Sequence, residues 1–349
     1  MIDQTDPGPG HDSRNVVKKE TKGISLLPWI KALLGLVGLA LFIHLLNRVG
    51  LGNILDNIRR LGFWFLLVFL VEAGRIFMQA CGWSTVHNAF FKTIPLKTLF
   101  RTKIISDNFN FAIPSASLGG DAVRTLMIRK IIPLKDGIPS VLFDKTLEYI
   151  GSTVFLMICF LLGLFSARLP DSLTIPLLTG LGVTTVGIVL LLFVQSRGVA
   201  RILWRISRFI PRFRRWVKSR EEQLREIDAN FRLLYSRRSS KVFRAGFFHL
   251  LSRLTGTMEV LIVLWVLKTP VSFVQAMLIS AVVIAVNTAF FVLPGQLGVM
   301  ESAHMMILKT LGYPPEIGLS LSMIRRIRRL VFVGLAMILF FVKRRKVPE

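Results

Sequence analysis

Long apolar runs, separated by short charged stretches, make up most of the chain from residue 26 onward. A helix needs about 20 residues to cross a hydrocarbon core of about 30 Å, because it rises about 1.5 Å per residue. Six runs are that long: Leu26–Leu46, Gly62–Cys81, Leu147–Arg168, Leu173–Val194, Val242–Leu267 and Ile317–Val342. They predict an all-α polytopic membrane protein with about six spanning helices.

Two further apolar regions, 104–130 and 271–312, are interrupted in the middle by proline and glycine. Asp107 and Asp121 lie seven residues either side of Pro114, and Asn287 and Glu301 lie seven residues either side of Pro294. Interrupted backbone at membrane depth is tolerated only where it packs in protein or lines a wet cavity. We therefore expect two re-entrant hairpins related by a weak internal duplication. The alternative is that the two prolines only kink ordinary helices.

Positive charge orients these elements. The 349 residues are 52% hydrophobic with a net charge of +25, which in a membrane protein indicates cytoplasmic loops and not a nucleic-acid partner. The expected division is a disordered cytoplasmic tail (1–25), a first membrane half (26–194), a basic cytoplasmic loop (195–241) and a second membrane half (242–349). Both termini are then cytoplasmic, as are Lys92, Lys97, Arg101 and Lys103. The two hairpins open to opposite sides, which is the inverted repeat of secondary transporters.

The basic loop carries arginines three or four residues apart, at Arg197, Arg201, Arg205, Arg208 and Arg212. Apolar residues lie between them, so the pattern predicts a basic helix on the membrane surface, against anionic lipids of the inner leaflet. The alternative is a topological anchor with no role towards a substrate. Elsewhere, both cysteines lie in apolar runs, where we interpret them as packing residues.

Ionisable residues also occur inside the apolar runs, including Glu72, Arg75, Arg253 and Glu259. A charge at the bilayer centre costs about 2.5–3.5 kcal/mol on insertion scales, so such residues indicate function by default. The densest set is Arg325-Arg326-Ile-Arg328-Arg329. If it only flanked a helix, the remaining stretch would span roughly 20 Å of the 30 Å required. We expect these arginines to enter the membrane; the alternative is an interfacial position with local thinning of the bilayer.

Guanidinium groups in a wet cavity are suited to bidentate capture of phosphate or carboxylate. Helix N-termini after Gly120 and Gly298 would add backbone N–H donors for the same anion. Signals for catalysis are weak: the Glu-x-x-His at Glu301 and His304 has no second copy, and no phosphate loop, nucleophile elbow or zinc-spaced set is present. We expect no enzyme activity, no cofactor and no metal ion.

At these motifs the sequence resembles the flippase-like transmembrane domain of bacterial lysylphosphatidylglycerol synthases and its stand-alone relatives. The resemblance covers about residues 25–345. It rests on the run from Asn110 through Pro114 to Arg124, on the run from Pro294 to Glu301, and on the arginine at 325 or 326. The family tends to have a glycine where Gln296 stands. The resemblance implies movement of a modified anionic phospholipid, a hopanoid or a glycolipid between leaflets, without the aminoacyl-transfer domain of the full-length synthases.

The resulting hypothesis is a lipid flippase-like transporter of the bacterial inner membrane. Arg325 and Arg326 would hold the headgroup phosphate, with Arg124 as a further candidate. Carboxylates would pair with these arginines in the empty state and take up protons. The full expected site is Asp107, Asn108, Asn110, Pro114, Gly119, Gly120, Asp121, Arg124, Asp144, Lys145, Pro294, Gly298, Glu301, Arg325 and Arg326.

Two alternatives to transport remain open at this stage. One is a membrane-embedded lipid transferase that uses Asp107, Asp121, Glu301 and His304. The other is a structural partner of a lipid-synthesis enzyme that acts through the basic loop 195–241. Two carboxylates within reach of one scissile bond would favour the transferase, whereas loss of all function on deleting the loop would favour the partner.

Overall fold

The computed structural model describes residues 61–112, 118–166, 171–208, 211–236, 239–290 and 296–344, with the isolated positions 52, 56 and 59. Over these residues the chain forms helices joined by turns, without strands, which confirms the all-α prediction. The helices are α3 (Trp64–Phe90), α4 (Leu96–Ala112), α5 (Leu118–Ile128), α6 (Leu134–Ser166), α7 (Asp171–Arg197), α8 (Val199–Ser207), α9 (Pro211–Lys218), α10 (Glu221–Ser236), α11 (Ser239–Val266), α12 (Phe273–Ala289), α13 (Val299–Thr310) and α14 (Pro315–Arg344).

Four of these helices, α3, α6, α7 and α11, are long and apolar enough to cross a membrane. They correspond to four of the predicted spans, and α14, with 30 residues, corresponds to a fifth. The predicted span Leu26–Leu46 lies outside the described residues. Helix α6 begins at Leu134, well before the predicted Leu147, because the polar residues at its start pack against α10 instead of ending the helix.

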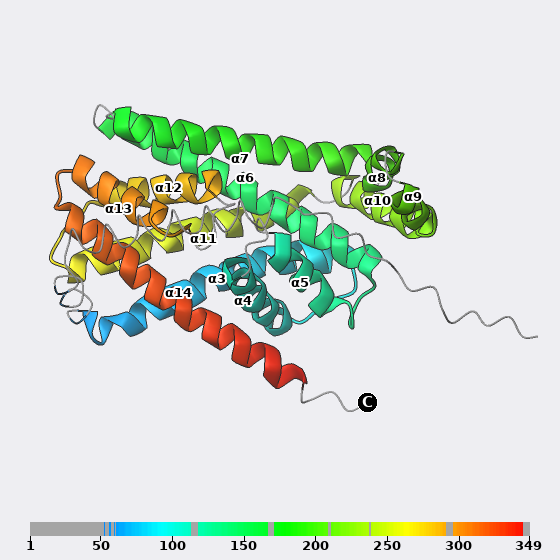
Figure 1. Cartoon of the computed structure of the whole chain (residues 1–349), viewed down its shortest axis with the longest axis horizontal. Helices are drawn as coiled ribbons and strands as arrows, with labels where there is room; N and C mark the ends of the chain where they lie inside the picture. The colour runs from blue at the N-terminus through cyan, green and yellow to red at the C-terminus, as the bar shows by residue number, and fades with distance from the viewer. Residues whose placement is uncertain are drawn as a thin grey trace, which may run out of the picture.

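The two interrupted regions each form a pair of helices. Helix α4 packs against α5, and α12 packs against α13. The interruptions fall at 113–117 and 291–295, around the two prolines, and these residues lie outside the described part. Because the helices on either side of each interruption lie against one another, they form hairpins and not single kinked helices. The α4–α5 pair lies towards the end of the bundle that carries α8–α10, and the α12–α13 pair lies towards the opposite end (Figure 1).

Helix ends in the second hairpin follow from local sequence. Ser272 caps α12: its hydroxyl accepts from the backbone N–H of Gln275, whose side chain accepts from the Ser272 N–H in return. Gly298, at φ +77°, immediately precedes α13, a left-handed conformation that glycine adopts without steric cost. Pro315 begins α14, where a missing N–H is tolerated.

The centre of the bundle is the close packing of α11 on α3 and α6. Glycines permit this approach. A Cβ on Gly82 of α3 would lie 3.0 Å from His249 Nε2, and a Cβ on Gly151 of α6 would lie 2.9 Å from His249 Cβ. Any larger side chain would push α11 away from its neighbours, so these contacts fix the spacing on which the buried polar groups depend.

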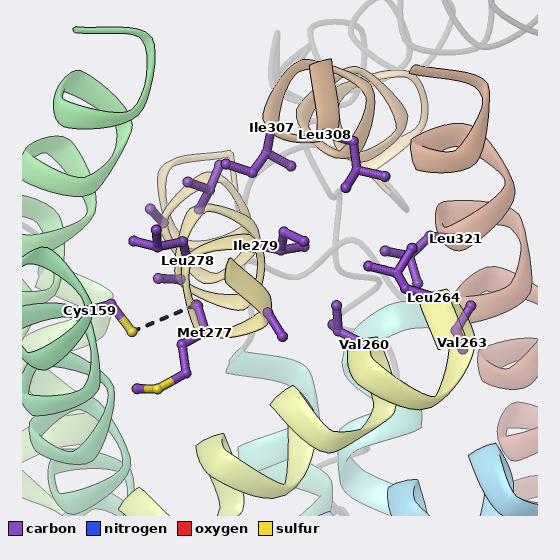
Figure 2. Close-up of a cluster of buried hydrophobic side chains, with 14 of the residues drawn as sticks. Cys159, Val260, Val263, Leu264, Met277, Leu278, Ile279, Ile307, Leu308 and Leu321 are labelled. Atoms are coloured by element: carbon purple, nitrogen blue, oxygen red, sulfur yellow. Dashed lines mark hydrogen bonds between the residues drawn. The ribbon is translucent and has the colours of Figure 1, made fainter. Parts of the chain in front are cut away.

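The largest hydrophobic cluster surrounds α12, which is buried along most of its length. Figure 2 shows side chains from α11, α13 and α14 converging on it, with Ile279 between Leu308 and Val260. On the other side, the Cys159 thiol of α6 donates to the carbonyl oxygen of Met277 over 3.6 Å. The predicted packing role of this cysteine is confirmed.

The basic region differs from the single surface helix expected. Helix α7 continues to Arg197, and Gly198, at φ +89°, ends it. Three shorter helices follow, α8, α9 and α10, gathered at one end of the molecule (Figure 1). Lys135 at the start of α6 donates to Glu226 of α10 over 3.0 Å, which ties this region to the bundle. A basic helix is confirmed over α8, which carries Arg201 and Arg205, but it is shorter than predicted, because Gly198 separates it from Arg197 and it ends at Ser207. Its position on the membrane surface stays a prediction.

Candidate functional site

Most ionisable side chains inside the bundle are ion-paired, and they gather in two groups. The α5–α6 cluster lies beside the first hairpin and contains Lys103, Asp107, Asp121, Arg124, Asp144, Lys145, Glu148, His249 and Arg253. The α14 cluster lies beside the second hairpin and contains Glu72, Arg75, Glu259, Glu301, His304, Arg325, Arg326 and Arg328.

Arg124 is the most enclosed residue of the α5–α6 cluster. Its side chain is fully buried, and Nη1 donates to Asp144 Oδ2 over 2.7 Å. Its Nη2 donates to the carbonyl oxygen of Val141 over 2.9 Å, and the guanidinium lies 4.6 Å from the ring centroid of Trp83. These partners come from two other helices, so Arg124 joins α5 to α6 and α3.

Asp144 is equally buried and collects several positive groups. Its Oδ1 lies 2.9 Å from His249 Nε2, and its Oδ2 lies 3.9 Å from Lys103 Nζ. Lys103 was expected in the cytoplasm, but the structure buries it inside the cluster, where Asp107 and Glu148 lie 3.7 and 3.4 Å from its ammonium. Helix α4 carries the lysine into the bundle, where carboxylates of α4 and α6 compensate its charge, and the side of the membrane on which it lies stays a prediction.

The accessible side of this cluster is held by longer contacts. Lys145 lies 3.7 Å from Asp121 and 3.8 Å from Glu148, and Arg253 lies 3.5 Å from Glu148. All four side chains are partly exposed. Contacts of this length with partial exposure are weaker than the Arg124 pair and leave the side chains freer to rearrange.

In the α14 cluster, the arginines lie near the middle of the long helix α14. Arg328 is buried and Arg325 and Arg326 are mostly buried, whereas Arg329 is exposed. The entry of these arginines into the membrane stays a prediction. Arg326 donates to Glu301 Oε1 through Nε over 3.0 Å and through Nη2 over 2.5 Å. Glu301 is fully buried and also accepts from the Ser322 hydroxyl over 3.4 Å.

Arg325 reaches from α14 to α11 and α13. Its Nη2 lies 3.2 Å from Glu259 Oε2 and 3.5 Å from the carbonyl oxygen of Gly256, and its Nη1 lies 3.3 Å from His304 Nε2. The same oxygen of Glu259 receives Arg328 Nη1 at 2.5 Å. One carboxylate on α11 therefore serves two arginines of α14.

Helix α3 completes this group. Glu72 Oε2 lies 3.1 Å from Arg328 Nη1, and Arg75 forms a two-point contact with Glu72 at 2.8 Å for each bond. Three guanidinium groups, those of Arg75, Arg325 and Arg328, thus share two carboxylates, those of Glu72 and Glu259. One positive charge is left without a paired carboxylate among the described residues, which is costly in an enclosed site.

The remaining predicted site residues lie around the hairpins. The Asn108 side-chain amide donates to the carbonyl oxygen of Ile104 in its own helix over 2.8 Å. Gly119 and Gly120 lie in the first turn of α5, which begins at Leu118 and not after Gly120 as expected, whereas α13 begins directly after Gly298 as expected. Pro114, Pro294 and the side chain of Asn110 lie outside the described part.

The expected site omitted several residues that the structure brings into the two clusters: Glu72, Arg75, Lys103, Glu148, His249, Arg253, Glu259 and Arg328. For most of them the available signal is a charge inside an apolar run, which by itself indicates a functional position. Partners on other helices could not be assigned from one sequence, because helix rotation and crossing are set by packing.

The four groups required by a transferase are divided between the clusters. Asp107 and Asp121 belong to the α5–α6 cluster, and Glu301 and His304 belong to the α14 cluster. The first three contact lysine or arginine, and His304 contacts Arg325. No described group of three or more His, Cys, Asp or Glu side chains is placed to hold a metal ion. The arrangement is therefore suited to recognising a negatively charged group through guanidinium side chains.

Comparison with known proteins places this arrangement in a family. A family model described as the lysylphosphatidylglycerol synthase TM region matches residues 29–336. The chain is also 26% identical over 324 residues to the UPF0104 membrane protein PH1989 of Pyrococcus horikoshii, covering 85% of this chain and 92% of that protein. No solved structure matches this chain.

Proposed function

The chain belongs to the lysylphosphatidylglycerol synthase transmembrane region family, and on that premise we propose that it moves a lipid with an anionic headgroup between membrane leaflets. The substrate class is a phospholipid, or a hopanoid or glycolipid that carries an anionic group. The family and the four apolar spanning helices make the chain a multi-pass membrane protein; the movement of lipid is the proposal.

The observation that carries this proposal is the position of partly exposed arginines halfway along α14. Arg325 and Arg326 each keep a portion of the side chain exposed while contacting buried carboxylates, Glu259 and Glu301. Guanidinium forks bind phosphate through two parallel hydrogen bonds. An arriving phosphate competes with the carboxylates for the same donors, so the empty and loaded states differ in which anion the arginines hold.

The proposed cycle uses both hairpins. The headgroup enters the polar interior while its acyl chains stay in the bilayer. The phosphate then replaces Glu301 as the anion that the arginines of α14 bind. The released carboxylate, like Asp121 and Asp144 in the other cluster, takes up a proton when its cationic partner leaves, because an unpaired buried charge is unfavourable. We interpret the two hairpins as halves of an inverted repeat, which lets the site open to one side and then to the other.

Reconstituted vesicles test the proposal. Purified protein is incorporated into liposomes with a fluorescent phosphatidylglycerol, and dithionite quenches the label in the outer leaflet. The wild-type protein should expose the inner-leaflet label to quenching, and Arg325→Ala and Arg326→Ala should slow this process strongly. Variants that move lipid as fast as wild type would reject the phosphate-holding role.

The two alternatives predict different results in the same preparation. A lipid transferase would change the mass of the lipid during incubation, whereas a transporter leaves the lipid chemically unchanged. A pure docking protein for a lipid-synthesis enzyme would move no lipid in vesicles and would lose its cellular function when residues 198–236 are deleted. The divided positions of the transferase candidates favour transport.

We further propose that the protein lies in the bacterial inner membrane with α8–α10 in the cytoplasm against anionic lipids. Exposed Arg201, Arg205 and Trp204 on α8 suit such a surface. A cysteine introduced at Lys309, in the last turn of α13, should react with an impermeant maleimide on intact cells. A cysteine at Arg215 of α9 should react only after the cells are broken, and the opposite labelling would reverse the topology.

A further inference from the structure

Three arginines from three helices meet at one turn of α11. Arg325 of α14 donates to the carbonyl oxygen of Gly256 over 3.5 Å. The side chain of Arg75, from α3, passes over the same residue, because a Cβ on Gly256 would lie 3.7 Å from Arg75 Cδ. Arg253 lies three residues earlier on α11, which places it on the same face of the helix. We call Arg75, Arg253, Gly256 and Arg325 the Gly256 niche.

The three guanidinium groups of the niche are similarly accessible. The side chains of Arg75, Arg253 and Arg325 are 19%, 18% and 17% exposed. By contrast, Arg124 has no exposed side-chain surface and Arg328 has 6%. The niche arginines therefore combine a mostly buried position with a surface that another molecule can reach.

Among the described residues, the carboxylates paired with the niche arginines do not neutralise their positive charge. Glu72 and Glu259 are shared by Arg75, Arg325 and the buried Arg328, which leaves one positive charge over. Among the described residues, the carboxylate within ion-pair distance of Arg253 is Glu148, at 3.5 Å.

Glu148 is itself shared, because Lys103 and Lys145 also lie within 4 Å of it. Arg253 therefore receives only part of one carboxylate. The lysines and arginines of the α5–α6 cluster are matched in number by its carboxylates, so the excess of positive charge is the one beside α14, and an enclosed excess of positive charge favours a bound anion.

Space for that anion is provided by the glycine. Gly256 has no side chain, and the nearest side-chain atom to its missing Cβ is in ordinary contact distance. Arg75 Cδ lies in contact with this turn of α11, so arginine side chains from α3, α11 and α14 border Gly256 without a bulky residue of α11 between them. A phosphate is the anion whose several oxygens match guanidinium donors that arrive from several directions.

We propose that the Gly256 niche binds the phosphate group of a lipid headgroup. The inference rests on the proposed function and extends it, because neither Arg75 nor Arg253 belonged to the expected site. The niche lies where α3, α11 and α14 meet, between the α5–α6 cluster and the α14 cluster. A phosphate in the niche contacts cations of both clusters. Without the phosphate, the two clusters are linked only through protein side chains.

Filling the niche without changing any charge is the sharpest test. Gly256→Leu places a branched side chain among the three guanidinium groups. Gly246→Leu is the matched control on the same helix, because nothing lies within 4 Å of its missing Cβ. Each full-length protein is purified in detergent with phosphatidylglycerol, and native mass spectrometry measures the bound phospholipid.

Wild type and Gly246→Leu should retain phosphatidylglycerol, and Gly256→Leu should lose it, with affinity reduced on the order of tenfold or more. Retention by Gly256→Leu at the wild-type level would overturn the proposal. Dioleoylglycerol, which has the same tails without phosphate, should not be retained by wild type. Equal retention of dioleoylglycerol would assign the binding to the acyl chains and overturn the phosphate site.

Two further arms complete the design. If Gly256→Leu does not fold, Arg253→Gln replaces it, because Lys103 and Lys145 still compensate the charge of Glu148 in that variant. Arg253→Gln should also lose phosphatidylglycerol. Unchanged binding would overturn the proposal. Binding of inorganic phosphate by a wild-type protein that retains no phosphatidylglycerol would assign the niche to free phosphate and overturn the lipid source. Since the assay measures binding alone, a protein that binds but moves no lipid would reject the proposed function and leave the niche intact.

Discussion

Arg124 and Arg325 are both guanidinium groups inside a bundle of membrane helices, but their surroundings differ. Arg124 is fully enclosed by a carboxylate, a carbonyl oxygen and an indole ring, with its Asp144 pair at 2.7 Å. Arg325 keeps part of its surface exposed, and it lies 3.2 Å from Glu259, a carboxylate that it shares with Arg328. Residue type alone therefore does not identify a binding group: the accessible, incompletely neutralised arginine is suited to a ligand, and the enclosed one is suited to holding helices together.

The largest effect should come from breaking the enclosed pair. Asp144→Ala leaves the Arg124 charge buried without its closest carboxylate, and removing one partner of a buried pair costs about 3–5 kcal/mol. We expect a large fall in melting temperature, which is measured by size-exclusion chromatography with fluorescence detection after heating. Asp121, at 3.6 Å, is too distant to replace the lost contact.

A double variant sharpens this result. Arg124→Leu combined with Asp144→Ala removes both charges, and apolar replacement of a buried pair is often close to neutral. The double variant should be more stable than Asp144→Ala alone. If the two losses simply add, the enclosed pair is not the source of the instability, and the contrast with Arg325 fails.

An intermediate effect is expected where α13 meets α14. A Cβ on Gly318 would lie 2.4 Å from the carbonyl oxygen of His304, so Gly318→Ala must separate the helix that carries Glu301 from the helix that carries Arg326. Overpacking of this kind costs about 1–3 kcal/mol. Gly334→Ala on the same helix, where nothing lies within 4 Å, is the control and should melt as wild type. Equal melting of both variants would show that the α13–α14 contact is looser than described.

The smallest effect should follow loss of an exposed ion pair. Lys135 and Glu226 join α6 to α10 over 3.0 Å, but both side chains are more than two-fifths exposed. Water and salt screen such pairs, so Lys135→Ala should leave the melting temperature unchanged within the resolution of the assay. A fall comparable to that of Asp144→Ala would show that burial does not separate strong pairs from weak ones in this protein.

Much of the fold could be predicted because its signals are local. Apolar length identified five of the described long helices, and proline with glycine marked where α4 ends before α5 and where α12 ends before α13. The arginines of α14 could be placed inside the bundle because the remaining apolar stretch is too short to span a membrane. Positions 107, 121, 144 and 301 likewise lie within the ion-paired clusters.

The rest depended on contacts between distant parts of the chain. Sequence alone placed Lys103 in the cytoplasm, whereas α4 turns it towards Asp144 and Glu148. The meeting of Arg75 and Arg325 at Gly256 requires the crossing of three helices, and side-chain packing decides that geometry. A glycine at positive φ, Gly198, also separates α7 from the basic helix α8.

The most direct measurement compares Asp144→Ala and Arg325→Gln for melting temperature with and without phosphatidylglycerol. A ligand that binds only the folded state raises its stability in proportion to its affinity. Arg325→Gln should melt near wild type without lipid and lose the rise that lipid produces, whereas Asp144→Ala should melt far lower and keep the rise. If Arg325→Gln keeps the full lipid-dependent rise, the accessible arginines do not bind the headgroup, and the account is contradicted.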